Sequence, residues 1–84
     1  MAGDAARDHL LSQRACPGCD LRRQDLAQLD LGQVDLRQAQ LQEANLLKAD
    51  LHLADLRGAN LGWAVLVQAD LREARLQGAQ LKDV

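Results

Sequence analysis

The stretch that decides the fold is residues 49–61, which read ADLHLADLRGANL. A small residue, an aspartate or asparagine and a leucine return in the same order every five positions. The leucines continue this register in both directions without an insertion, at Leu21, Leu26, Leu31, Leu36, Leu41, Leu46, Leu51, Leu56, Leu61, Leu66, Leu71, Leu76 and Leu81. These thirteen leucines predict a structure that repeats once every five residues, with the leucines as its core.

A period of five fits neither regular element. On an α-helix, a step of five residues rotates each leucine by roughly 140° from the last, so the leucines would scatter around the cylinder. In a straight strand, an odd step places successive leucines on opposite faces. The small residue and the leucine are two apart, however, so they share one face of a short extended segment. The chain can keep both inward only by turning once per unit, which predicts a coil of short sides stacked in layers.

The composition agrees with such a coil. The chain has 84 residues, which suits one domain. Hydrophobic residues make up 48% of the chain but aromatic residues only 1%, so the core has to be built from leucine and alanine. The net charge of −2 excludes an overall polybasic nucleic-acid binder.

The repeated unit resembles a known motif. The runs at residues 49–51, 54–56, 59–61 and 69–71 match A(D/N)LXX, so residues 19–83 resemble the pentapeptide-repeat family. The resemblance implies an all-β fold, a right-handed quadrilateral β-helix with four pentapeptides per coil. Thirteen repeats then give about three coils.

The two ends of the coil differ in sequence. We expect residues 1–18 to form an N-terminal cap, with a short α-helix over residues 4–15, and residues 19–84 to form the repeat solenoid, all in a single domain. A solenoid needs its ends covered, so we expect Leu10 or Leu11 to cover the first coil. No comparable cap is seen at the other end, so the last coil is open or another chain covers it.

Two cysteines, Cys16 and Cys19, frame the segment that leads into the repeats. No apolar segment typical of a signal peptide is present near the start, so we expect a cytoplasmic protein with reduced cysteines. Cys19 then serves as a small core residue and Cys16 packs under the cap. A disulfide, or a metal or redox role, remains as an alternative, although His9 and His52 supply no obvious further zinc ligands.

Function is expected at the outward positions of the repeats. With four units per coil, residues twenty apart stack, so Asp30, Asp50 and Asp70 form a ladder. The next side carries Asp35, Asp55 and Arg75 beside Arg37 and Arg57. We interpret both sides as solvated, charge-balanced faces whose aspartates serve the turns. An acidic ladder that binds cations or a basic partner is the alternative.

One side is apolar instead. Trp63, Val65, Val67 and Leu47 are expected to lie together on the outer surface, with Val65 in a position where the repeat prefers aspartate or asparagine. A contiguous exposed apolar patch usually marks an interface, and tryptophan is enriched in binding hot spots. We therefore predict protein binding at these four residues.

The chain has few residues that could carry out catalysis. Ser12 is the only serine and no glycine-rich phosphate loop occurs, so we expect no enzyme, no catalytic, metal or cofactor site and no small-molecule substrate. No run of 18 apolar residues suggests a membrane span, and no nucleic-acid partner is expected. The predicted function is a non-catalytic protein-interaction or scaffold module with an unidentified protein partner.

Two other functions stay open beside that one. The first is self-association through the uncapped C-terminal coil, with a homodimer as its simplest form. The second, less favoured, comes from the family resemblance: some members mimic DNA and protect gyrase. DNA carries one charge per about 1.7 Å, far more than a chain with a net charge of −2 can offer.

Overall fold

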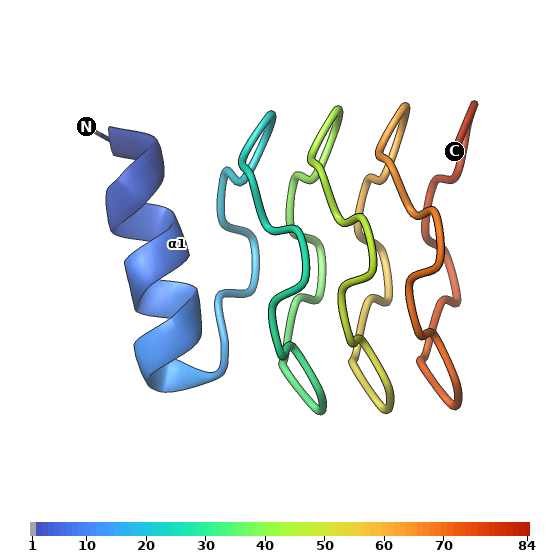
Figure 1. The fold of residues 1–84 in the computed structure, drawn as a ribbon, viewed down its shortest axis with the longest axis horizontal. Helices are drawn as coiled ribbons and strands as arrows, with labels where there is room; N and C mark the ends of the chain where they lie inside the picture. The colour runs from blue at the N-terminus through green and yellow to red at the C-terminus, as the bar shows by residue number, and fades with distance from the viewer. Residues whose placement is uncertain (1) are drawn as a thin grey trace.

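The protein is a stack of coils with one helix across its end (Figure 1). The computed structural model describes the backbone of residues 2–84 and the side chains of residues 5–84. The helix, α1, spans Ala2–Gln13. The coils contact one another through single-residue parallel bridges between positions twenty apart, as from Asp30 to Asp50 and from Asp50 to Asp70. Since the repeat is five residues long, each coil has four sides.

Every side ends in the same tight turn. Within the unit at Leu46, the N–H of Ala49 donates to the carbonyl of Leu46 at 3.0 Å. The second residue after each leucine has a positive φ, for example 60° at Leu53 and 71° at Gly58. A positive φ at the third of four turn residues is the signature of a type II turn. The chain therefore does turn once every five residues, which confirms the sequence prediction.

The aspartates and asparagines complete these turns. The Asp50 carboxylate accepts the backbone N–H of His52, two residues later, at 3.1 Å. The same bond recurs in nine units, from Asp20, Asp25, Asp30, Asp35, Asn45, Asp50, Asp55, Asn60 and Asp70. The position before the leucine is polar because its side chain closes the turn, as we predicted.

Backbone hydrogen bonds hold successive coils together. On one side, the Leu51 N–H donates to the carbonyl of Asp70 at 2.7 Å, and the Asp70 N–H donates to the carbonyl of Ala49 at 2.9 Å. These bonds repeat along each side, so the stack satisfies its own backbone groups layer by layer.

The core is a column of leucine and alanine. The central leucines from Leu21 to Leu61 have no exposed surface. The prediction that all thirteen are core is wrong for Leu81 alone, because Leu66, Leu71 and Leu76 still pack against the core. Leu66, Leu71 and Leu76 are only half-buried, and Leu81 is 44% exposed, because no further coil packs on that side of them.

The coil begins earlier than residue 19. Ala15 bridges to Asp35, and the Cys16 N–H donates to the carbonyl of Asp35 at 2.8 Å. Residues 15–18 thus form a side of the coil, and residues 15–84 make three and a half coils. The helix accordingly ends at Gln13 rather than at residue 15, because Arg14 takes a φ of 56° that leaves the helical conformation.

The helix covers the first coil with a short apolar face. Leu10 is fully buried, and Ala6 and Leu11 are partly buried against the core. Arg14, which the sequence analysis did not single out, fastens the junction: its guanidinium donates to the carbonyls of Asp30 and Gly32, both at 2.6 Å. In the described part of the chain, no helix has the length and apolar character needed to cross a membrane.

Candidate protein-binding surface

The apolar side patch consists of Trp63, Val65, Val67 and Leu47. Trp63 is 54% exposed, Val65 42% and Val67 59%, whereas Leu47 is half-buried. Trp63 sits at the turn that leads into the side carrying Val65 and Val67, so three exposed apolar side chains fall within five residues. All four residues that the sequence predicted for binding therefore lie on neighbouring parts of the surface.

The backbone under the patch is firmly held. The Val65 N–H donates to the carbonyl of Ala44 at 3.0 Å, and the Val65 carbonyl accepts the N–H of Leu46 at 2.9 Å. The Val67 carbonyl accepts the N–H of Lys48 at 2.9 Å, and the Trp63 N–H donates to the carbonyl of Lys82 at 2.8 Å. A partner would thus meet a preorganised surface, which lowers the entropy lost on binding.

Val65 breaks the turn rule of the repeat. Its aliphatic side chain cannot accept the N–H of Val67, whereas nine other units make the equivalent bond through an aspartate or asparagine. An intramolecular hydrogen bond of this kind contributes about 0.5–1.5 kcal/mol. The unit at Val65 therefore gives up turn stability and gains an exposed apolar side chain in return.

Trp63 breaks a second local rule. It occupies the positive-φ position of its turn, with φ at 57°. This position elsewhere holds glycine or a polar residue, except at Leu53. Positive φ is uncommon for residues other than glycine and is a genuine outlier for bulky ones. Such outliers are a reason to ask what function the residue serves.

The surface beside Trp63 is hollowed. An open hollow of about 470 Å³ is lined by Trp63, Ala64, Val65, Leu66, Val67, Asp83 and Val84. The ammonium of Lys82 stands 5.3 Å from the centre of the indole ring, which is within the range of a cation–π contact. The hollow has apolar walls, with the Asp83 carboxylate and the Lys82 ammonium beside them.

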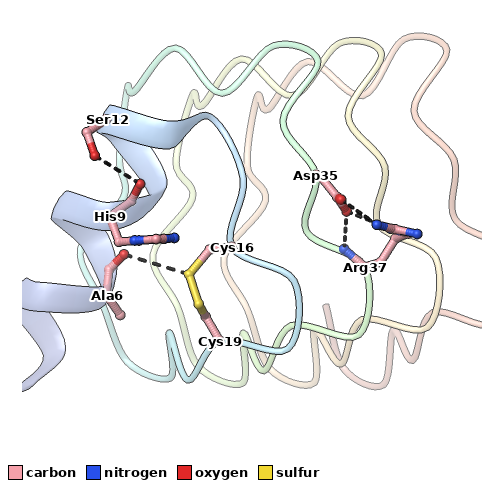
Figure 2. Close-up of a disulfide and its surroundings, with 7 residues drawn as sticks. All are labelled: Ala6, His9, Ser12, Cys16, Cys19, Asp35 and Arg37. Carbon is pink, nitrogen blue, oxygen red and sulfur yellow. Dashed lines mark hydrogen bonds and ion pairs between the residues drawn. A yellow bond between two sulfur atoms is a disulfide. The ribbon is translucent and has the colours of Figure 1, made fainter.

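The charged sides are neutralised from within the repeat. In several units, an arginine two residues after the aspartate donates two hydrogen bonds to its carboxylate. Arg57 donates to Asp55 at 2.6 and 2.8 Å, and Arg37 donates to Asp35 in the same way (Figure 2). Hydrogen bonds from the Arg57 side chain lower the pKa of Asp55 to about 2. This arrangement confirms the charge-balanced interpretation of the sides.

Each aspartate of the ladder also has a side-chain partner. Asp70 lies 2.7 Å from the guanidinium of Arg72, and Asp50 lies 2.7 Å from Nδ1 of His52. Asp30 is 3.6 Å from Arg14. Among the residues whose side chains are described, no three His, Cys, Asp or Glu side chains gather as a metal site would require.

The expectation of reduced cysteines is wrong in this structure. Cys16 and Cys19 form a disulfide, with their α-carbons 5.4 Å apart. The reason is the repeat itself: Cys16 fills the leucine position and Cys19 the small position of the same turn, Cys16 within the core and Cys19 partly buried against it. That spacing lies inside the range that a disulfide spans.

Comparison with known proteins identifies the family. The model for pentapeptide repeats matches residues 19–58 and 54–84, with eight copies of the repeat. The chain belongs to the pentapeptide-repeat family. Its fold is therefore the β-helix solenoid of that family, as the sequence predicted. A search of curated proteins finds no match.

Three solved pentapeptide-repeat proteins are similar to this one. Rfr23 from the cyanobacterium Cyanothece 51142 aligns over 92% of this chain and 93% of its own, with 23% identity and a TM-score of 0.58. AT2G44920 from the Arabidopsis thaliana thylakoid lumen is 31% identical, over 94% of this chain and 58% of its own, with a TM-score of 0.47. Protein alr5209 from Nostoc Pcc 7120 is 32% identical, over 93% and 74%, with a TM-score of 0.36.

Proposed function

We propose that this pentapeptide-repeat protein is a non-catalytic binding module that engages a protein partner through the apolar side patch. The solenoid, right-handed by the family resemblance, serves as a rigid support. The observation that carries the proposal is the coincidence of two broken repeat rules at one place. Trp63 stands where the turn favours glycine or a polar residue, and Val65 stands where the turn favours aspartate or asparagine.

Both departures act against the stability of the isolated chain. The left-handed backbone at Trp63 costs roughly 1–2 kcal/mol relative to glycine, as it does at the other turns without glycine. The missing turn bond at Val65 adds about 0.5–1.5 kcal/mol. Sequences depart from consistent local choices mainly at functional sites. Two departures within three residues, both toward exposed apolar side chains, favour a binding role over random variation of the repeat.

The shape of the patch suits the anchoring side chain of a partner. The hollow of about 470 Å³ beside Trp63 has apolar walls formed by Val65, Leu66 and Val67. Interfaces draw most of their affinity from a few aromatic or aliphatic anchors seated in such hollows. The indole of Trp63 and an inserted partner side chain would then shield each other from water.

Self-association is the second candidate, and a specific observation favours it. Leu81 is 44% exposed, and Leu66, Leu71 and Leu76 of the same coil are only half-buried. A second copy stacked on this coil would bury these leucines and pair the backbone groups of both edges. A Leu81→Asp variant should then abolish the dimer, as measured by sedimentation equilibrium.

DNA mimicry is disfavoured by the internal pairing of charges. A DNA mimic has to present unpaired negative charge along a rod. Here Asp20, Asp35, Asp55 and Asp70 each hold an arginine of the same unit within 2.8 Å. A gyrase supercoiling assay with excess protein should therefore show neither inhibition nor protection.

The binding proposal is tested by capture from a lysate of the source organism with matched variants. The test variant combines Trp63→Gly with Val65→Asn. The control combines Leu53→Gly with Gln40→Asn, which introduces the same two residues at the same repeat positions on other parts of the coil. A partner held by the wild type and the control but lost from the test variant supports the proposal. Equal capture by all three proteins contradicts it.

A further inference from the structure

The disulfide lies where the cap meets the coil. Cys16 and Cys19 close the first turn of the solenoid, directly beneath α1 (Figure 2). The sulfur of Cys16 lies 4.0 Å from the carbonyl oxygen of Ala6 in α1. No other turn of the described coil carries a covalent cross-link, and the proposed binding surface does not involve this one.

The two cysteines differ in exposure. Cys16 is 1% exposed and belongs to the core cluster, whereas Cys19 is only half-buried. Thiol–disulfide exchange proceeds by attack of a thiolate on one sulfur, so access decides which sulfur is attacked. Cys19 is the more exposed residue of the two, so we expect an external thiolate to attack the sulfur of Cys19 and the sulfur of Cys16 to leave.

The helix is attached to the coil by few contacts. Leu10 is its one fully buried side chain among the described residues, and Ala6 and Leu11 are partly buried. The other contacts lie at the junction between α1 and the coil. There Arg14 donates hydrogen bonds to two carbonyls of the first coil, and the disulfide fixes the turn. Segments with few buried apolar contacts open at lower free energy than the rest of a fold.

We propose that the Cys16–Cys19 disulfide is a redox latch: it fixes the coil turn against which α1 packs, and so holds α1 on the first coil. In the closed form, the disulfide takes the place of the leucine packing that stabilises every later turn. In the open form, the two cysteines are thiols and α1 separates from the coil more readily. The latch acts on the cap, so it is independent of the apolar side patch, which lies on later coils of the solenoid.

The reductant is a dithiol. Its thiolate attacks the sulfur of Cys19, which forms a mixed disulfide and releases the Cys16 thiolate, which takes up a proton. The second thiol of the reductant then attacks its own sulfur in the mixed disulfide and releases Cys19. Two electrons and two protons pass to the protein, and the dithiol leaves as a cyclic disulfide.

Two physical effects loosen the cap on reduction. The sulfurs move from bonded distance to van der Waals contact, so they need more room under α1, where Cys16 is already enclosed. Reduction also restores the chain entropy that the closed ring withholds from the opened turn. Opening would expose the helix-facing side of the first coil, where Leu21, Leu26 and Leu31 are now fully buried.

Hydrogen exchange followed by mass spectrometry tests the latch on the full chain. The oxidised protein is compared with the same protein in dithiothreitol, after alkylation of a sample has shown complete reduction. We expect amides in residues 5–14 and 16–19 to exchange faster in the reduced form. The factor is up to about twentyfold where opening of the cap also opens the turn at residues 16–19, as expected for release of a four-residue ring. Amides in residues 41–61 should not change.

The sequence supplies its own control for unfolding. Trp63 is the only tryptophan and lies in the third coil counted from α1, so its fluorescence reports whether the coil stays folded. The amides of a Cys16→Ala, Cys19→Ala variant should exchange as fast as those of the reduced protein, and dithiothreitol should not change their exchange rates. Unchanged exchange after complete reduction would overturn the latch. Reduction that occurs only on global unfolding, or loss of the whole coil on reduction, would also overturn it.

Discussion

The middle coils and the last coil are built from the same five-residue unit, yet their leucines have different surroundings. Leu41 and Leu61 have no exposed surface, whereas Leu81, which stacks in the same column, is 44% exposed. The residue type, the turn and the register are identical in all three. The difference shows that burial in this solenoid is conferred by the layers on either side and not by the unit itself.

The largest expected change in the free energy of unfolding comes from alanine substitution of a leucine in a middle coil, compared with the leucine stacked on it in the last coil. Leu51→Ala removes a fully buried side chain between two coils, and we expect it to lower the free energy of unfolding by about 3 kcal/mol. Leu71→Ala, one coil further on, should lower it by only about 1 kcal/mol because Leu71 is already half-exposed. Urea denaturation followed by circular dichroism measures both. Equal losses would break the comparison between the coils.

The cap should show a similar contrast within one helix. Leu10 is fully buried against the first coil, whereas its neighbour Leu11 is only partly buried. Leu10→Ala is expected to destabilise the oxidised protein by about 2 kcal/mol, and Leu11→Ala by about half of that. Thermal unfolding of the two variants compares them. If Leu10→Ala is neutral, α1 does not cover the core.

A substitution that crowds two neighbouring coils should lower the free energy of unfolding by a smaller amount. A β-carbon on Gly32 would lie 2.5 Å from Cε1 of His52, whose ring is held by Asp50 at 2.7 Å. Gly32→Ala should therefore destabilise the fold by about 1 kcal/mol, because the ring has to move. His52→Ala removes the obstruction, so the double variant should recover most of the loss. A double-mutant cycle without coupling would contradict this.

The smallest effect should appear in acid. The pKa of Asp55 in the fold is about 2, below its ordinary value of 3.8, because Arg57 donates hydrogen bonds to it. A lowered pKa in the fold stabilises it above pH 3.8, and this contribution disappears as the pH falls from 3.8 toward 2. In the Arg57→Gln variant, the free energy of unfolding should therefore fall slightly less between pH 3.8 and pH 2 than in the wild type. The control Arg23→Gln removes the same charge but leaves these hydrogen bonds intact, so an identical change there would contradict the prediction.

Much of the scaffold could be predicted from the sequence because it is repetitive. The unbroken leucine register from Leu21 to Leu81 specified one turn per unit, and the aspartates before the leucines were correctly interpreted as turn-closing residues. The exposure of Trp63, Val65 and Val67 also followed from the register. One sequence, read in units of five, fixes which side chains point outward.

The parts that were missed depend on packing between dissimilar elements. The start of the coil at Ala15 could have been found by counting one unit back from Leu21, since Cys16 keeps the leucine register. The disulfide follows from that same position. The role of Arg14 had no signal, because its contacts with Asp30 and Gly32 depend on how α1 sits on the first coil. The exposure of Leu81 depends on the layer beyond it.

The central claim is that Trp63 and Val65 are retained for binding and weaken the fold. The most direct measurement is the free energy of unfolding of the Trp63→Gly, Val65→Asn variant, which restores the ordinary residues of both repeat positions. We predict that the variant is about 1.5–3.5 kcal/mol more stable than the wild type, from relief of the left-handed backbone (about 1–2 kcal/mol) and the regained turn bond (about 0.5–1.5 kcal/mol). A variant that is less stable than the wild type would mean that these side chains serve the fold, and would contradict the account.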